Sequence, residues 1–532
     1  MQPREEVSVD DALVGSVGEF GHGQARIYLL TNLIWLISAL QVYSMIFVET
    51  DPVFSHNWRC RSNDDELCVK LSGLAASEKL QIQFCNLERD RWEWTHRGRS
   101  IVSDFELQCQ EWRVGLVRLL FFAGQFLGSG LVGYASDKIG RRKGLLLSIG
   151  MSGFGTLVGA FAPNYWVYCA ARFATGLGFG GQVVAAFVLW TEFVGPSKRG
   201  KLGIATQLLF VVGQCLLVLL AYVIPGWRTL SLIIACCTIS FFLAWVWLPE
   251  SPRWWLSKGK KGDATSVLAA VASANKKKLP EMPLREIAQL GNTDRLLWEV
   301  VKSRKLRRSL VIILAIWFSV CVIYYGVPLM LEQAPGSMHL NFMLAAIVEL
   351  PAYILCILLV DRVGRKPIFV WGFFVGAVCC LSLVIAPNEF VLPFVVISKF
   401  STSSVFAVAF VYTTETFPTS VRATCLGLAS LSARLGGVLT HVAIGILGAG
   451  LSLVVFGALG LFAGMVALGL PETMGTHLPD AVEVTTAPKR HQMFEETSSL
   501  TLDVGQPHAP GRWFRWGRKK ASLTYSRFDD VT

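Results

Sequence analysis

Four ionisable residues interrupt long apolar stretches of this sequence, and their side chains are the first candidates for chemistry. They are Arg172, Glu349, Lys399 and Arg434. A carboxylate in an apolar stretch can bind a cation or take up a proton, and a guanidinium offers a planar fork of donors to a carboxylate. Because such groups are costly among apolar residues, we interpret the last three as candidate binding positions. Arg172 begins an Arg-Phe-Ala-Thr-Gly run, for which we favour packing or gating.

Aromatic and amide side chains extend this candidate site. Tyr324 and Tyr325, with Trp317 one to two turns earlier, could offer ring faces to a quaternary ammonium group, although ordinary packing explains any single ring equally well. Gln207 and Gln214 fall on one face of a helix. These two amides either contact a substrate or join neighbouring helices through hydrogen bonds.

The composition indicates that membrane-spanning helices position these side chains. Hydrophobic residues make up 53% of the 532 residues and charged residues only 16%, which is typical of a polytopic membrane protein. Apolar runs of about 20 residues, the length that crosses a bilayer, predict two groups of six helices. The first group is 26–47, 113–134, 144–162, 165–190, 202–223 and 229–248, and the second is 309–331, 338–360, 367–386, 390–414, 423–445 and 449–470.

Charges in the loops predict the topology. Lys and Arg gather after the second, fourth and eighth spans, so by the positive-inside rule these loops, both termini and the linker 249–308 are cytoplasmic. Segment 1–25 is polar and acidic, so we expect the first span to act as an uncleaved anchor. The loop 48–112 is then extracytoplasmic, between helices of the bundle 26–248, and the second bundle is 309–470. Topology and anionic lipid account for the net charge of +11, which argues against nucleic-acid binding.

The extracytoplasmic loop and the tail carry features of their own. In the loop, four cysteines predict two disulfides with three alternative pairings; they are Cys60, Cys68, Cys85 and Cys109. The tail 471–532 loses the apolar spans, so we expect a disordered cytoplasmic segment. Its basic and aromatic residues at 512–520 either contact anionic lipid or stay solvated. Ser522 is a candidate phosphorylation site that would release the tail.

A charged motif recurs at the same place in both groups of helices. Residues 133–143 read Gly-Tyr-Ala-Ser-Asp-Lys-Ile-Gly-Arg-Arg-Lys, and residues 361–366 read Asp-Arg-Val-Gly-Arg-Lys. Two like bundles that rock around a shared site are typical of transporters, and charges at their cytoplasmic ends can pair in one state only. Topology alone would explain the bases but not the repeated Asp and Gly. The candidate gating residues are Asp137, Arg141, Arg142, Glu192, Arg199, Glu250, Arg253, Asp361, Arg365, Glu415, Arg422 and Glu472.

The first motif resembles that of the major facilitator superfamily, Gly-x-x-x-Asp-x-x-Gly-Arg-Arg-Lys, and the resemblance extends over about 18–473. Three further motifs also resemble this superfamily. They are Pro-Glu-Ser-Pro-Arg-Trp at 249–254, Thr-Glu-Thr-Phe-Pro-Thr-Ser-Val-Arg at 414–422 and Pro-Glu-Thr at 471–473. The cysteine-bearing loop and the Tyr-Tyr-Gly at 324–326 look like the organic cation, organic anion and carnitine transporters. Three further stretches look closest to the plant branch of that family: 92–95, 162–166 and 195–200.

The resemblance implies an all-α integral membrane protein with the major facilitator fold, which is twelve transmembrane helices in two pseudo-symmetric six-helix bundles. It implies a secondary transporter that moves small organic cations or zwitterions such as carnitine by alternating access, as a symporter or uniporter. No cofactor is implied, and a proton is a candidate coupling ion. In this family, cation-selective members tend to have Asp at the position of Arg434, whereas anion or zwitterion carriers tend to have Arg. Arg434, Glu349 and aromatic rings together suit a molecule with both charges.

Some features depart from the family or leave alternatives open. The loop 48–112 contains no glycosylation sequon, and Arg118 replaces a usual Gln, so it either lines the outer mouth of the cavity or snorkels. Glu349 either takes up a proton or pairs with Lys399 or Arg434. A sugar or polyol carrier and an organic anion carrier are the alternatives within transport, although the first span has no acidic residue of the kind that proton-coupled sugar porters use.

Other classes of protein are less well supported. The sequence has no catalytic, metal-binding or phosphate-binding motif, so we do not expect an enzyme. A receptor or scaffold that no longer transports should have lost the gating motifs, which are present here. We expect a plasma-membrane protein, with the vacuolar membrane as the alternative.

Overall fold

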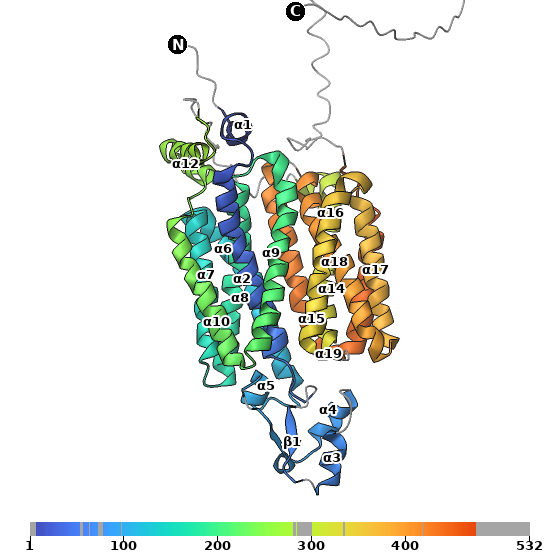
Figure 1. The fold of residues 1–532 in the computed structure, drawn as a ribbon. Helices are drawn as coiled ribbons and strands as arrows, with labels where there is room; N and C mark the ends of the chain where they lie inside the picture. The colour runs from blue at the N-terminus through green and yellow to red at the C-terminus, as the bar shows by residue number, and fades with distance from the viewer. Residues whose placement is uncertain are drawn as a thin grey trace, which may run out of the picture. The chain divides into compact units, whose positions relative to one another are not determined.

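The structure, a computed structural model, describes residues 7–53, 57–62, 64–72, 78–96, 98–279, 284, 300–333, 336–417 and 419–474. Long helices dominate it, and the helices of the N-terminal half and of the C-terminal half form two neighbouring groups (Figure 1). Helices are the expected solution for apolar runs of this length, because lipid offers no hydrogen-bond partner to the backbone. Ten helices among the described residues are long and apolar enough to cross a membrane.

The first group contains six apolar helices. They are α2 (His22–Val48), α6 (Glu111–Ile139), α7 (Arg141–Ala160), α8 (Tyr165–Thr191), α9 (Pro196–Val223) and α10 (Trp227–Ser240), which the 3₁₀ helix η3 (Phe241–Val246) continues. Glycines let α6 and α8 approach closely: a Cβ atom on Gly128 would lie 1.9 Å from the carbonyl oxygen of Leu177, and one on Gly176 would lie 2.0 Å from that of Phe121. Small residues at such contacts are a common way to pack membrane helices.

The second group has the same number of apolar segments. They are α14 (Arg304–Gly326) with the 3₁₀ helix η4 (Val327–Gln333), α15 (Met338–Ile347) with α16 (Glu349–Val363), α17 (Arg365–Ile385), α18 (Asn388–Thr416) and α19 (Thr419–Ala467). The long helix α19 is two helices joined at Gly448, whose φ of 73° interrupts the helical backbone. The segment 338–360, expected as one span, is divided just before Glu349. The described residues thus contain the two groups of helices that the sequence predicts.

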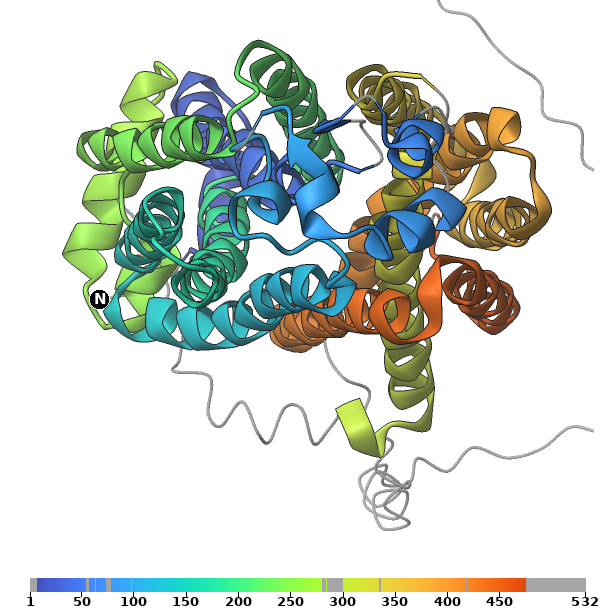
Figure 2. The ribbon, with the colours of Figure 1, turned by 90° about the horizontal axis from the view of Figure 1, so that it is seen from below.

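A small domain with two disulfides lies between α2 and α6. It contains β1 (Trp58–Cys60) and β2 (Trp92–Trp94), which pair antiparallel, together with η2 (Arg89–Arg91), α3 (Glu66–Ser72), α4 (Glu78–Cys85) and α5 (Ile101–Asp104). Of the three alternative pairings, the structure has Cys60–Cys68 and Cys85–Cys109. Figure 2 shows these elements in front of the membrane helices. Their own core includes Trp58, Phe84 and Trp92, and the disulfides supplement it because so small a core stabilises little by itself.

Short helices cover the opposite end of the first group, which the sequence predicts to be cytoplasmic. They are α1 (Val9–Ala12), the π-helix η1 (Leu13–Val17), α11 (Pro252–Ser257) and α12 (Lys261–Ala274). Val9, Leu13 and Val17 are buried in one apolar cluster with Phe193 and Leu268. The N-terminal segment is therefore packed against this end. Ser522 and most of the predicted tail lie outside the described residues.

Candidate functional site

Glu349 is the centre of a buried polar cluster. It is the first residue of α16, and its side chain is 0% exposed. Lys399 of α18 places Nζ 3.0 Å from Glu349 Oε1. Tyr324 of α14 donates its hydroxyl to the carboxylate at 3.0 and 3.2 Å, and Tyr353 of α16 donates to Oε2 at 3.0 Å. The buried carboxylate thus has both a counter-charge and hydrogen-bond donors, which it needs in order to remain ionised away from water.

Two side chains of the first helix group complete this cluster. Gln214 of α9 donates from Nε2 to Glu349 Oε1 at 3.1 Å, and Tyr43 of α2 accepts a hydrogen bond from Lys399 Nζ at 3.0 Å. Glu349 and Lys399 belong to the second group, so both contacts cross between the groups. Polar contacts at this interface can break when two bundles move relative to each other.

The ammonium group of Lys399 lies in a cage of aromatic rings and a carboxylate. Its Nζ is 3.2 Å from the ring centroid of Tyr324 and 5.3 Å from that of Tyr43. Aromatic faces and a carboxylate are the groups that recognise organic cations in proteins. The cage therefore stabilises a positive charge, which in this structure belongs to the protein itself.

A row of rings leads from this cage to α19. The ring centroid of Tyr325 is 5.2 Å from that of Tyr324 and 5.1 Å from that of Phe122, and Phe122 stacks on His441 of α19 at 4.5 Å. Arg434, also on α19, interacts electrostatically with Tyr325. Its Nε has no hydrogen-bond partner among the described residues. Arg434 therefore has donor capacity close to the cage.

The predicted substrate-binding residues divide into two sets. Of those proposed from the sequence, the structure brings together Gln214, Tyr324, Glu349 and Lys399, with Tyr325 and Arg434 beside them. Gln207, buried on α9, forms no hydrogen bond with this set within the described part of the chain. Trp317 donates from Nε1 to Thr413 and packs edge-on against Phe406 and Phe410, so it is a packing residue. Glu349 pairs with Lys399 and not with Arg434.

The sequence reasoning missed Tyr43 and Tyr353. Tyr353 follows Glu349 by four residues, so the spacing of side chains on one helix face could have revealed it. Tyr43 has no comparable signal, because its partner Lys399 lies 356 positions later in the chain.

A second ionic cluster lies at the C-terminal end of α2. Glu49 follows α2, and its Oε2 accepts a hydrogen bond from Arg118 Nε at 3.1 Å, while Arg172 Nη2 lies 3.4 Å from Oε1. Burial raises the pKa of Glu49, although Arg172 and Arg118 act in the opposite direction. Arg118 is thus paired with a buried carboxylate. Arg118 and Arg172 lie in predicted spans that contain no Asp or Glu. That was the signal for a carboxylate partner outside the spans.

The gating candidates of the first half form two kinds of contact. Arg141 of α7 pairs with Asp137 and with Glu192, the latter at 3.4 Å. Glu250 instead accepts a hydrogen bond from the backbone N–H of Arg142 at 3.1 Å. Burial raises the pKa of Glu250, although the backbone donors oppose the shift. Glu250 therefore caps the N-terminus of α7, and Arg141 forms the ion pairs.

Arg199 and Arg253 share a partner that the sequence did not predict. Their Nη2 atoms lie 2.6 and 2.5 Å from Oδ1 of Asp10 in the N-terminal helix α1. Burial acts to raise the pKa of Asp10, but the guanidinium groups of Arg253 and Arg199 outweigh it and hold the pKa below its ordinary value. The backbone N–H of Gly195 also donates to the carbonyl of Glu19 at 2.9 Å. Segment 7–20 is thereby tied to the first helix group.

The second half repeats the arrangement of the first. Arg365 binds Glu415 through Nε at 3.0 Å and Nη2 at 2.7 Å. Glu472 accepts hydrogen bonds from the backbone N–H groups of Arg365 and Lys366, at 2.9 and 3.0 Å. Burial acts to raise the pKa of Glu472, but these and neighbouring backbone donors lower it overall. The side chains of Asp361 and Arg422 lie outside the described residues.

The glycine in each motif makes room for the capping carboxylate. Gly140 and Gly364 have φ values of 113° and 94°, which favour glycine. A Cβ atom on Gly140 would lie 2.3 Å from Oε2 of Glu250, and one on Gly364 would lie 2.7 Å from Oε2 of Glu472. The repeated Gly therefore serves both the turn and the cap at a helix N-terminus, where a carboxylate is favourable.

Comparison with known proteins is consistent with this geometry. The model of the family described as sugar (and other) transporter matches residues 41–484. A protein of Arabidopsis thaliana named organic cation/carnitine transporter 4 is 34% identical over 496 residues, which cover 90% of this chain and 91% of that protein. A Xenopus laevis protein named solute carrier family 22 member 15-like is 32% identical over 498 residues. These residues cover 91% of this chain and 97% of that protein.

Solved structures give the fold. The proton:xylose symporter XylE, of the major facilitator superfamily, superposes with a TM-score of 0.62 at 19% identity, and the match covers 86% of this chain and 98% of that one. At that identity the likeness concerns the fold alone. Together with the family match, it shows that this chain is a multi-pass membrane transporter for a small molecule and belongs to the sugar (and other) transporter family.

Proposed function

We propose that this transporter carries small organic cations and zwitterions such as carnitine, and that the positive charge of the substrate takes the place of Lys399 Nζ. The observation that carries the proposal is the cage of Glu349, Tyr324 and Tyr43 around that ammonium group. Relatives named organic cation/carnitine transporters support the choice of substrate class.

Charge balance favours a zwitterion over a simple cation. Glu349, Lys399 and Arg434 together carry a net charge of +1. A substrate with both charges leaves that value unchanged, because its ammonium can bind Glu349 and its carboxylate can bind Lys399 or Arg434. A simple cation would raise the net charge to +2 in a buried site, which is costly unless a proton leaves. We therefore propose that uptake of a simple cation depends on pH more steeply than uptake of a betaine.

Alternating access would use the contacts that cross between the helix groups. The bonds of Gln214 to Glu349 and of Tyr43 to Lys399 join the groups near the cage. A substrate ammonium that binds Glu349 would displace both Gln214 and Lys399 from it. Because Lys399 must then move, its hydrogen bond with Tyr43 breaks as well. The ion pairs of Arg141 and Arg365 at the predicted cytoplasmic ends would then open and close the inner side, because guanidinium and carboxylate groups on flexible side chains can exchange partners.

An organic anion carrier is the second candidate. The observation in its favour is the unpaired Nε of Arg434 beside Tyr325. An anion would need to bind Arg434 and leave the contacts of Glu349 intact. We place the transporter in the plasma membrane, with the disulfide-bonded domain outside the cell, and the vacuolar membrane is the alternative. Localisation of a fluorescent fusion protein decides between them.

Uptake by the full chain in proteoliposomes tests the substrate class. Labelled carnitine, tetraethylammonium and a dicarboxylate are supplied at two external pH values. We expect carnitine uptake in the wild type, its loss in Glu349→Gln and a weaker affinity in Arg434→Ala. Glu389→Gln, which changes an exposed carboxylate on α18, is the matched control and should transport normally. Uptake of the dicarboxylate without carnitine would support the anion carrier instead.

A further inference from the structure

Two helices of different groups, α6 and α19, approach each other closely, and a histidine lies at this contact. A Cβ atom on Gly437 of α19 would lie 2.7 Å from Cδ1 of Phe122 of α6. One turn further along α19, the imidazole of His441 stacks on the ring of Phe122, with 4.5 Å between the ring centroids and 27° between the ring planes. His441 is 4% exposed. The imidazole is therefore buried in the interface between the two groups of helices.

The hydrogen bonds of His441 indicate that its ring is neutral. Nδ1 lies 2.8 Å from the carbonyl oxygen of Gly437, and because a carbonyl oxygen only accepts, Nδ1 carries a proton. Nε2 has no hydrogen-bond partner among the described residues. A proton on Nε2 as well would give a buried charge whose second donor has no acceptor, which costs free energy. In the closed interface, Nε2 therefore holds a lone pair.

The groups around His441 do not compensate a positive charge. Arg118 of α6, although it is paired with Glu49, acts electrostatically against a charge on the imidazole. Arg434 lies two turns earlier on α19 itself. Beyond their basic first turns, α14 and α17, which also pack against α19, have no charged residue, and their titratable side chains are Cys321, Tyr324, Tyr325, Cys379 and Cys380. Within the described part of the chain, no carboxylate pairs with His441, so a second proton is unfavourable while the interface stays closed.

His339 is the other histidine of the predicted spans, and it lies at the same interface. It belongs to α15, and its ring lies 5.2 Å from that of Phe47 of α2 and 5.8 Å from that of Tyr222 of α9, measured between centroids. Because His339 is only half-buried, its protonation does not require the helix groups to separate. It is therefore the histidine from which the behaviour of His441 must be distinguished.

We propose that Nε2 of His441 binds a proton when the two groups of helices separate, and that this proton keeps α6 and α19 apart. Separation brings water to the imidazole, and water stabilises the charge that the closed interface leaves uncompensated. A ligand that binds one state only shifts the equilibrium toward that state. His441 is thus a proton site that couples pH to the opening of the transporter, whatever its substrate.

Amide hydrogen exchange of the purified full chain in detergent micelles without substrate tests the proposal. Exchange in 114–126 of α6 and 433–446 of α19 is compared at pH 5.5 and pH 7.5, after correction for the intrinsic rate. Imidazole in water has a pKa of about 6.5. If only the open state binds the proton, the ratio of open to closed molecules rises about tenfold between these pH values. We expect exchange at pH 5.5 to be faster by up to that factor.

Two variants remove the proton site in different ways. His441→Phe keeps a ring against Phe122, and His441→Gln keeps a polar side chain of similar size, so one of them serves if the other folds poorly. Both should exchange at equal corrected rates at the two pH values. His339→Gln and His22→Gln, the latter at an exposed position of α2, are the controls and should respond as the wild type does.

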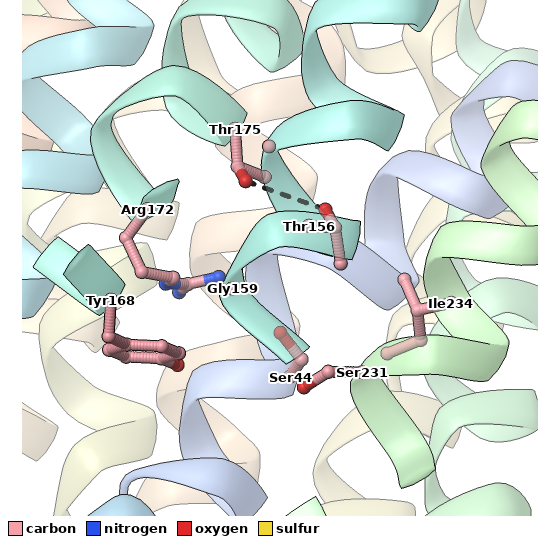
Figure 3. A pocket seen from close by; sticks show the side chains of 9 residues that line it. Ser44, Thr156, Gly159, Tyr168, Arg172, Thr175, Ser231 and Ile234 are labelled. Atoms are coloured by element: carbon pink, nitrogen blue, oxygen red, sulfur yellow. Dashed lines mark hydrogen bonds between the residues drawn. The ribbon is translucent and has the colours of Figure 1, made fainter. Parts of the chain in front are cut away.

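An internal reference comes from α7. Residues 150–160 of this helix contribute to a small pocket whose lining belongs to the first group alone (Figure 3), so their corrected exchange should be the same at both pH values. Equal corrected rates in α6 and α19 of the wild type at the two pH values would overturn the proposal. A wild-type response in both His441 variants, or its loss in His339→Gln, would overturn it as well, because the proton would then act elsewhere. None of these outcomes bears on the cage, since no substrate is present.

Discussion

Replacement of Glu349 by Gln removes a charge from the cage with little change in shape. Lys399 is then left with a buried ammonium and no carboxylate, since both side chains are at most 1% exposed. Loss of one partner of a buried ion pair typically costs about 3–5 kcal/mol, whereas replacing both partners by uncharged residues can be close to neutral. We therefore expect Glu349→Gln and Lys399→Met each to lower the free energy of unfolding by about that amount, and the double variant to be more stable than either single variant.

The order of the three variants in thermal unfolding of purified protein is the decisive measurement. Glu389→Gln serves as the control for loss of a carboxylate from an exposed place. If the effects of the two single variants simply add in the double variant, Glu349 and Lys399 are not coupled and the argument from the buried pair is refuted.

Cation binding separates the same variants in a different way. Lys399→Met keeps the carboxylate and both rings but removes the resident ammonium, so a simple organic cation should bind more tightly than in the wild type. Glu349→Gln should bind it more weakly. Equilibrium binding of labelled tetraethylammonium in micelles measures both affinities. Equal weakening in both variants would mean that Lys399 assists cation binding and does not compete with it.

Three further predictions concern other parts of the chain. Asp10→Asn removes the carboxylate that two guanidinium groups share, so amide hydrogen exchange in 7–17 should become faster; unchanged exchange would show that apolar packing alone holds this segment. Burial raises the pKa of Asp51 to about 6, so ionisation destabilises the folded state as pH rises from about 4 to 6, and the gain in thermal stability of Asp51→Asn over the wild type should be larger at pH 7.5 than at pH 4. The reverse order would contradict the shift. Loss of the disulfide Cys85–Cys109 should destabilise the small domain by about 3 kcal/mol, as its loop length suggests, and limited proteolysis of the double Ala variant measures this.

The sequence predicted which polar residues lie among apolar helices, but only partly how they pair. Apolar runs and the repeated motif were enough to predict helices in two groups, because length and hydropathy decide membrane insertion locally. They left Glu349 with two candidate partners, Lys399 and Arg434. The choice depends on how each helix is rotated about its axis, and rotation is set by packing against neighbours from distant parts of the chain.

Partners in loops were the hardest to predict. Asp10 and Glu49 belong to polar segments outside the predicted spans, where a charge needs no partner. In the folded chain, Asp10 lies between Arg199 and Arg253, and Glu49 lies between Arg118 and Arg172. The pairing of these carboxylates depends on tertiary packing, which residue spacing does not encode.

The two kinds of carboxylate at the repeated charged motifs suggest which contacts change during transport. Glu250 and Glu472 bind backbone N–H groups at the first turns of α7 and α17, and those donors cannot rotate away without unwinding the helix. Glu192 and Glu415 bind guanidinium groups on flexible side chains, which can exchange partners. We infer that the caps keep each motif rigid, while the pairs of Arg141 and Arg365 open and close. If so, Glu415→Gln should change the balance between inward and outward states with little loss of stability, whereas Glu472→Gln should weaken the N-terminus of α17 itself.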